Sequence, residues 1–259
     1  RFSPLEPLQY WIDIVTAGVR PEDVKVLGID GGRIAACEYH FALALGACVA
    51  VLEKGGREAA RLLPDEDWGM AERLLVLPRE AAMIHEYLWS ADQPCPAAIE
   101  PKLEDLARKI HDAYCQEQLD KIRQRTGSYV LWDDLRQVFK DSNLAQARHY
   151  FETLRCGNLQ VREVQGRSVM LPDWALTDEE LKREGRKVTA EQREINRRLL
   201  DTMARAEHAR FVVERYQTGW KWGEEKDEKA KTNPTLISWR DLGESVRELD
   251  RIAVRNIPK

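Results

Sequence analysis

The stretch that decides the fold is DVKVLGIDGGRIAACEYHFALALGACVAVLE, residues 23–53. It opens on DVKVLGI, a short apolar segment typical of a strand buried on both faces of a parallel sheet. Apolar residues then recur at helical spacing in RIAACEYHFALALG, and ACVAVLE predicts a second buried strand. Two buried strands joined by a helix form a β-α-β unit, so the sequence predicts a parallel sheet covered by helices.

The same alternation of helix and strand extends to both sides of this unit. LEPLQYWIDIVTAG, residues 5–18, has the apolar spacing of a helix, and Gly18 suits its C-terminal end. Further along, GREAARLL predicts another helix and LLVLP a third short strand. Residues 1–90 are therefore expected to form a partial, Rossmann-like α/β domain.

The rest of the sequence predicts mainly helical structure. Three prolines in SADQPCPAAIEP predict a linker. Residues 91–175 then predict a mostly helical region that closes on a hairpin hinged at Gln165–Gly166, with a winged-helix outline. Residues 176–259 form the third expected domain, with a charged helix from about Thr189 to Thr218. The predicted fold class is α/β followed by mainly α.

Composition narrows the classes of function. Hydrophobic residues make up 43% of the 259 residues, enough for buried cores, and 32% are charged. The net charge of −4 argues against a surface that binds nucleic acid throughout, and the basic runs KREGRK and REINRR suit a solvated helix. No apolar run approaches the roughly 18 residues of a membrane span, and there is no signal peptide. We therefore expect a cytoplasmic protein for which nucleic acid is not a partner.

The cysteines and the chain start add two expectations. The five cysteines are scattered without a CxxC pair, which favours reduced structural thiols over a zinc site or a disulfide framework. We expect neither a metal nor a cofactor. The chain begins at Arg1 rather than at a methionine, which favours the C-terminal part of a longer protein with an effector or membrane segment in front.

A glycine pair marks the junction between the first strand and its helix. Gly31 and Gly32, followed by Arg33, let a ligand approach the backbone, and the free N–H groups of the first helical turn attract phosphate. A tight turn alone would also explain the pair.

The glycine pair followed by Glu38 is similar to the PGGxGTxxE motif of the lysine-decarboxylase-like nucleoside-phosphate hydrolases, and so to the SLOG superfamily of Rossmann-like nucleotide-binding domains. This resemblance implies that the glycines cradle phosphate and that Glu38 helps to cleave the bond between base and ribose. Because Asp30 stands where the family has proline, binding carries over better than hydrolysis.

The stretch GWKWGEEKDEKAKTNPTLISWRDL, residues 219–242, sets three tryptophans among acids and lysines. Together with the preceding helix and the end of the chain, it resembles the RyR domain, a module named from repeats in ryanodine receptors that also occurs in bacterial and phage proteins. The fixed spacings that carry the resemblance are Glu207–His208, Arg210, Arg215, Gly219–Trp220, Trp222–Gly223, Asp227, Lys231, Asn233–Leu236, Trp239, Leu242, Asp250–Arg251 and Ile257–Pro258.

Residue chemistry and resemblance together predict a ligand-binding site for a nucleotide-type small molecule. Indole rings stack on bases, arginine forks grip phosphate, and acidic side chains accept hydrogen bonds from ribose hydroxyls. The residues expected to bind the ligand are Glu207, Arg210, Arg215, Trp220, Trp222, Asp227, Lys231 and Trp239. Burial in the domain core is the alternative for each tryptophan, and Trp222 is the one we most expect there.

Three functions follow from these patterns. The leading hypothesis is a non-enzymatic sensor of a nucleotide or nucleotide-derived signal, which forms a homo-oligomer and regulates an effector in a bacterial conflict, antiviral defence or signalling system. The enzymatic alternative is a nucleoside-phosphate N-glycosidase that uses Glu38 and the Gly31–Gly32 loop. The third is a scaffold for protein assembly, whose aromatic loop docks protein.

Overall fold

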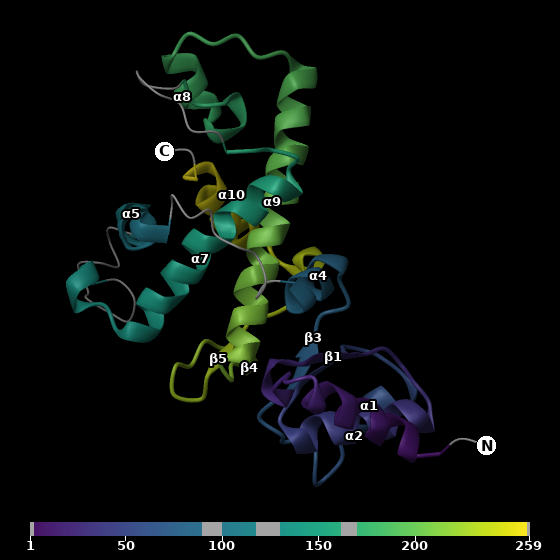
Figure 1. Ribbon diagram of the computed structural model, residues 1–259. Coiled ribbons are helices and arrows are strands. Elements are labelled where there is room, and N and C mark those ends of the chain that lie inside the picture. Colours follow the sequence, from purple (N-terminus) through teal and green to yellow (C-terminus); the bar gives the residue numbers. More distant parts are fainter. Residues whose placement is uncertain (1–2, 90–99, 118–129, 162–169, 258–259) are drawn as a thin grey trace. The chain divides into compact units, whose positions relative to one another are not determined.

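The computed structural model describes residues 3–89, 100–117, 130–161 and 170–257 (Figure 1). It confirms the predicted fold class, with a parallel three-stranded sheet and its helices followed by a mainly helical part. The chain divides into two compact units, which we call the α/β unit and the helical unit. The α/β unit is residues 1–88 with 212–238, and the helical unit is residues 89–211 with 239–259.

The α/β unit is built on strands β1, β2 and β3, which are parallel and hydrogen-bonded in that order. Each helix and strand predicted here is present to within a few residues, and α4 was not predicted. The elements are α1 (Leu5–Thr16), β1 (Lys25–Gly28), α2 (Arg33–Leu45), β2 (Cys48–Leu52), α3 (Arg57–Arg61), β3 (Leu74–Leu77) and α4 (Ala81–Trp89).

Strand β2 is central, and its side chains are buried on both faces of the sheet. Val49 and Val51 point into a cluster formed with α1 and α2. Ala50 and Leu52 point the other way, into a cluster with α4 and with α9 (Ala190–Gln217). Because successive side chains of a strand alternate between the two faces, an unbroken apolar run is what a strand buried on both sides requires.

Helix α1 is apolar on two sides. Its residues Pro7 and Trp11 are buried against the unit, as the helical spacing predicted. Leu5, Ile12 and Val15 are exposed on its outer face.

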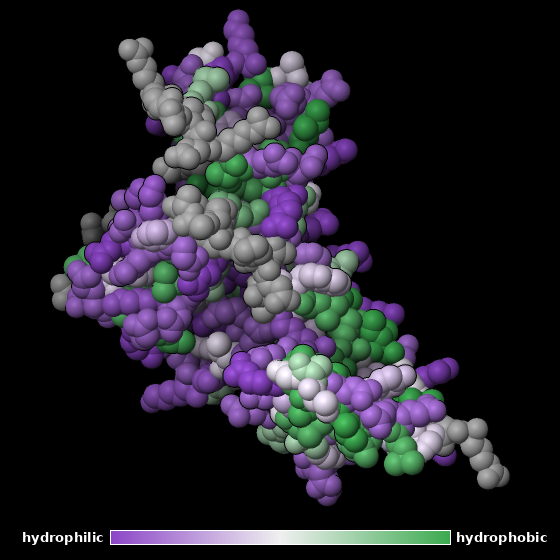
Figure 2. All heavy atoms as spheres, in the orientation of Figure 1, coloured by the Kyte–Doolittle hydropathy of each residue, from purple (hydrophilic) through white to green (hydrophobic). Residues whose placement is uncertain are grey.

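In the space-filling view, hydrophobic side chains gather over parts of the α/β unit, whereas hydrophilic ones dominate around α7 (Gln137–Cys156) and α5 (Leu103–Glu117) (Figure 2).

The helical unit holds most of the remaining helices. Helices α5 and α7 pack around a core that includes Trp132 and Phe139. Helix α8 (Asp178–Arg183) starts with a capping box, in which the Thr177 hydroxyl accepts the Glu180 N–H and the Glu180 carboxylate accepts the Thr177 N–H. The unit ends on α10 (Glu244–Arg255).

Helix α9 belongs to both units, since residues up to Phe211 group with the helical unit and those from Val212 with the α/β unit. The predicted boundaries at residues 90 and 175 stay predictions. The expected hairpin at Gln165–Gly166 and most of the expected proline linker lie outside the described residues. Among the helices of the described ranges, none combines the length and the apolarity that a membrane-spanning segment needs.

Candidate ligand-binding site

Residues 219–235, which we call the tryptophan loop, are held in shape by backbone hydrogen bonds. Two short parallel strands, β4 (Lys221–Trp222) and β5 (Thr232–Asn233), face each other across it. Asp227 and Thr232 exchange backbone hydrogen bonds of 3.0 and 2.9 Å. A side chain at Gly223 would bring its Cβ within 2.7 Å of the Thr232 Cβ, so the two strands approach closely only because this residue is glycine.

Two residues predicted to bind the ligand stabilise this loop instead of standing free. One carboxylate oxygen of Asp227 accepts the N–H groups of Lys229 and Ala230, at 2.7 and 3.0 Å. The Lys231 ammonium donates to the Thr218 carbonyl at 2.8 Å. Bonds of this kind fix the backbone of a turn, so the acid and the lysine of the motif first determine the shape of the loop.

The two tryptophans of the loop differ sharply in exposure. Trp220 is 8% exposed. Its backbone N–H donates to the Arg215 carbonyl at 2.9 Å, and the Arg215 guanidinium lies 5.2 Å from the centroid of the Trp220 ring. Trp222, two residues further along, is 53% exposed. The expectation that Trp222 belongs to the core was wrong, because the chain turns Trp220 back onto the end of α9 before β4 begins.

Glu207 and Arg210 form a buried ion pair in the helical unit. The Arg210 Nε and Nη2 atoms donate to the Glu207 carboxylate at 2.8–3.2 Å, and both residues are less than 10% exposed. From α7, His149 Nδ1 lies 3.8 Å from the same carboxylate. Burial opposes ionisation of Glu207, but Arg210 and His149 outweigh it and hold the pKa of Glu207 below its ordinary value. Burial and the Glu207 charge both raise the pKa of the adjacent Tyr150 phenol.

A second histidine–carboxylate pair involves His208, the residue of α9 that follows Glu207. His208 Nδ1 is 3.3 Å from Asp250 of α10, and burial raises the pKa of Asp250 although His208 partly offsets it. The His208 ring meets Trp239 edge-on at 5.9 Å. The guanidinium groups of Arg247 and Arg251 lie 5.8 and 6.0 Å from the Trp239 ring centroid. Trp239 is therefore buried, at 3% exposed, among cations of its own chain.

The eight predicted ligand residues thus fall into two groups. Glu207, Arg210 and Trp239 lie in the helical unit. The α/β unit contains the other five, which are Arg215, Trp220, Trp222, Asp227 and Lys231. Glu207 and Arg210 form a buried cluster with His149 and Tyr150 of α7. Sequence reasoning missed these two α7 residues. No spacing could have signalled them, because they lie far upstream of the motif.

The glycine junction after β1 has a packing explanation. Gly31 has φ +74°, and a side chain there would place its Cβ within 2.6 Å of the Ala35 Cβ and 2.8 Å of the Tyr39 hydroxyl. Asp30 accepts the Gly56 N–H at 2.6 Å, so a carboxylate already occupies the junction. A second anion would meet this negative charge. The other predicted residues here, exposed or half-buried, are Gly32, Arg33 and Glu38.

A buried cysteine–histidine pair on α5 has no nucleophile chemistry. Cys115 Sγ lies 3.5 Å from His111 Nε2, but the same nitrogen lies 2.7 Å from the Val130 carbonyl. A carbonyl only accepts, so this nitrogen carries its proton and does not take one from the thiol. Burial also raises the pKa of Cys115, which favours the inert thiol. Elsewhere in the described ranges, no three His, Cys, Asp or Glu side chains gather where they could hold a metal ion.

Comparison with known families identifies the C-terminal part. The family model of the RyR domain matches residues 167–259, so these residues contain a RyR domain, as the resemblance predicted. The match spans α8 to α10, the tryptophan loop and each of the eight predicted ligand residues. The N-terminal parallel sheet is not assigned to a family. No curated protein matches the chain.

Proposed function

We propose that this chain is a non-enzymatic sensor whose RyR domain binds a nucleotide or nucleotide-derived signal and regulates an effector in a bacterial defence or signalling system. The observation that carries the proposal is the exposure of Trp222 on a loop fixed by its own hydrogen bonds. Tryptophan is enriched at interfaces because its ring combines a large apolar face with a polar N–H, so an exposed indole on an ordered loop is a candidate contact surface.

The chemistry of the loop suits a planar, anionic ligand. An indole face stacks on a base of any identity, and each such contact contributes about 1–3 kcal/mol. Lys221 and Lys226 are exposed close to Trp222 in the chain and can attract phosphate, while the exposed Glu224 and Glu225 beside them limit the number of phosphate charges that the loop can accept. Because the loop is already ordered, little conformational entropy is lost when a ligand binds.

The buried residues of the motif support this surface indirectly. Trp220 under Arg215, together with the hydrogen bonds of Asp227 and Lys231, keeps the loop in one shape. In this proposal these residues position Trp222, and Trp222 makes the stacking contact.

The N-terminal sheet fits a partial SLOG-type domain in its parallel topology, and we include that assignment in the proposal. The ligand is assigned to the tryptophan loop and not to the glycine junction, because Asp30 lies at the junction as a competing anion. The N-glycosidase alternative predicts release of free base from a nucleoside monophosphate, lost in Glu38→Gln. Absence of free base in a chromatographic assay of the unmodified protein removes it.

The sensor proposal is tested by calorimetry with adenine nucleotides, ADP-ribose derivatives and cyclic dinucleotides. At least one should bind, and Trp222→Ala should weaken that binding tenfold or more. The matched control is Trp89→Ala, since Trp89 is 52% exposed and lies outside the loop. Silence across the panel, or equal loss in both variants, would contradict the proposal. A stable oligomer that binds none of these compounds would favour the scaffold.

A further inference from the structure

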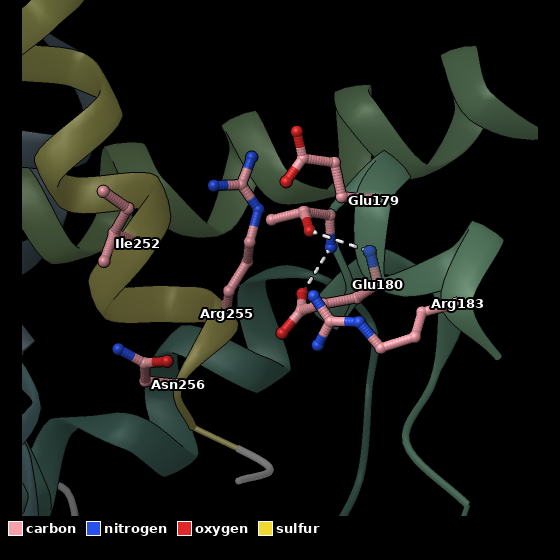
Figure 3. A pocket seen from close by; sticks show the side chains of 7 residues that line it. Glu179, Glu180, Arg183, Ile252, Arg255 and Asn256 are labelled. Atoms are coloured by element: carbon pink, nitrogen blue, oxygen red, sulfur yellow. Dashed lines mark hydrogen bonds between the residues drawn. The ribbon is translucent and has the colours of Figure 1, made fainter.

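A polar groove separates α8 from α10 within the helical unit, away from the residues used above (Figure 3). Its volume is about 280 Å³. The lining residues are Thr177, Glu179, Glu180, Arg183, Ile252, Arg255 and Asn256. All of them belong to the RyR domain.

Two of its charged side chains, Glu179 and Arg183, are exposed and come from the same helix. Glu179 and Arg183 stand one turn apart on α8, with the acid first, which is the favourable order for an ion pair on a helix surface. Within the described part of the chain, neither forms an ion pair or a side-chain hydrogen bond, with the other or with any third residue. Both side chains instead border the groove (Figure 3).

The opposite wall comes from the end of α10. Arg255 donates one N–H to Glu248 at 2.6 Å, and its guanidinium has further donors. Ile252 supplies an apolar surface, and the Asn256 amide both donates and accepts. On the α8 side, Glu180 is already engaged by the capping box.

The balance of charges limits the class of ligand. Two carboxylates and two guanidinium groups line the groove, so their formal charges cancel. A phosphate-rich ligand would gain from the arginines but would be repelled by the glutamates. The volume also lies just below the roughly 300–1,000 Å³ of pockets for drug-sized ligands. A small molecule that carries one charge of each sign matches both limits.

We infer that this groove binds a free α-amino acid. The ligand carboxylate accepts the paired N–H donors of Arg183, and the ligand ammonium donates to Glu179. The amino-acid side chain lies along Ile252, and Asn256 provides a neutral hydrogen-bonding partner. This site is independent of the nucleotide site proposed on the tryptophan loop.

The test is calorimetry of the whole chain with leucine, serine, glutamate and lysine, and with N-acetyl-leucine amide, which lacks both charges. At least one free amino acid should bind at millimolar or lower concentration, and the blocked leucine should not. Arg183→Gln and Glu179→Gln should each weaken binding about tenfold, whereas Lys182→Gln, an exposed neighbour that does not line the groove, should leave it unchanged. Far-UV circular dichroism of the unliganded variants shows that each is folded.

Three results would overturn the inference. These are no binding of any free amino acid with a Kd of about 1 millimolar or below (about −4 kcal/mol), equal binding of the blocked leucine, or binding that survives both groove substitutions. Trp222→Ala should leave amino-acid binding intact, so failure of the nucleotide proposal and failure of this one give different results.

Discussion

Charged and aromatic side chains have different surroundings in the tryptophan loop and in the buried cluster of the helical unit, which consists of Glu207, Arg210, His149 and Tyr150. In the loop, backbone hydrogen bonds hold a chain of polar residues so that Trp222 faces solvent. In the cluster, Glu207 and Arg210 are removed from water and hydrogen-bonded to each other, with His149 beside them. One sequence motif thus contains both a candidate recognition surface and an internal ionic framework.

This difference separates binding from folding within a single motif. A charged side chain removed from water is costly to leave without its partner, whereas an exposed one contributes little to stability. Substitutions in the buried cluster should therefore act mainly on the free energy of unfolding. Substitutions at the exposed indole should act mainly on affinity.

The largest effect is expected from Glu207→Gln. The change keeps the size of the side chain but leaves the Arg210 charge buried without that carboxylate, at a cost of about 3–5 kcal/mol. Urea unfolding followed by circular dichroism measures the loss. Glu191→Gln, at an exposed position of the same helix, is the matched control. A loss below about 1 kcal/mol would mean that the pair behaves like a surface ion pair.

Part of that loss should depend on pH. The pKa of Glu207 is lowered by folding, so its contribution is fully present above the ordinary value of 4.5 and is lost as the pH falls through the folded-state pKa. The raised pKa of Asp250 acts with the opposite sign, because its protonation on acidification favours the folded state. The difference in unfolding free energy between the unmodified protein and Glu207→Gln isolates the contribution of the Glu207 carboxylate, because Asp250 is present in both proteins. That difference should shrink below pH 4.5, and a constant difference would refute it.

Trp220→Ala should cost somewhat less, about 3 kcal/mol, because it removes a buried indole and the surface on which Arg215 lies. The same unfolding experiment applies. Trp222→Ala is the internal comparison, and equal losses for the two would erase the distinction between a structural and an exposed tryptophan.

Asp227→Ala should lower the unfolding free energy by about 1 kcal/mol, since two backbone N–H groups lose their acceptor. It should also raise hydrogen exchange at Lys229 and Ala230. Unchanged exchange at these amides would show that the carboxylate does not order the loop.

The smallest change in stability is expected for Trp222→Ala, within about 0.5 kcal/mol of the unmodified protein. A larger loss would mean that the ring packs on the chain in solution and is not presented to a ligand. Differential scanning calorimetry of this variant beside Trp220→Ala gives the comparison directly.

Local patterns predicted the regular elements well. The run from residue 23 to residue 53 predicted β1, α2 and β2, because a strand buried on both faces and a helix on one face leave distinct apolar spacings. Helix α4 was missed because its nine residues fall short of the roughly 10–12 residues over which a helix can be told from a strand by apolar spacing.

The candidate site was less predictable. Motif spacing identified Trp220 and Trp222 together but did not show which of the two is buried. That depends on the backbone hydrogen bond from Trp220 to the Arg215 carbonyl at the end of α9. The partnership of Glu207 with His149 brings together α7 and α9, and such tertiary contacts leave no periodic trace in one sequence.

The central claim is that Trp222 is held open for a planar ligand while Trp220 supports the loop. Its most direct test follows the indole N–H signals of the eight tryptophans in a ¹⁵N-labelled sample, assigned with Trp222→Phe, Trp220→Phe and Trp89→Phe, during titration with the nucleotide panel. We predict that the Trp222 signal shifts progressively with at least one nucleotide while the Trp220 and Trp89 signals stay in place. A Trp222 signal that does not move with any of them would contradict the account.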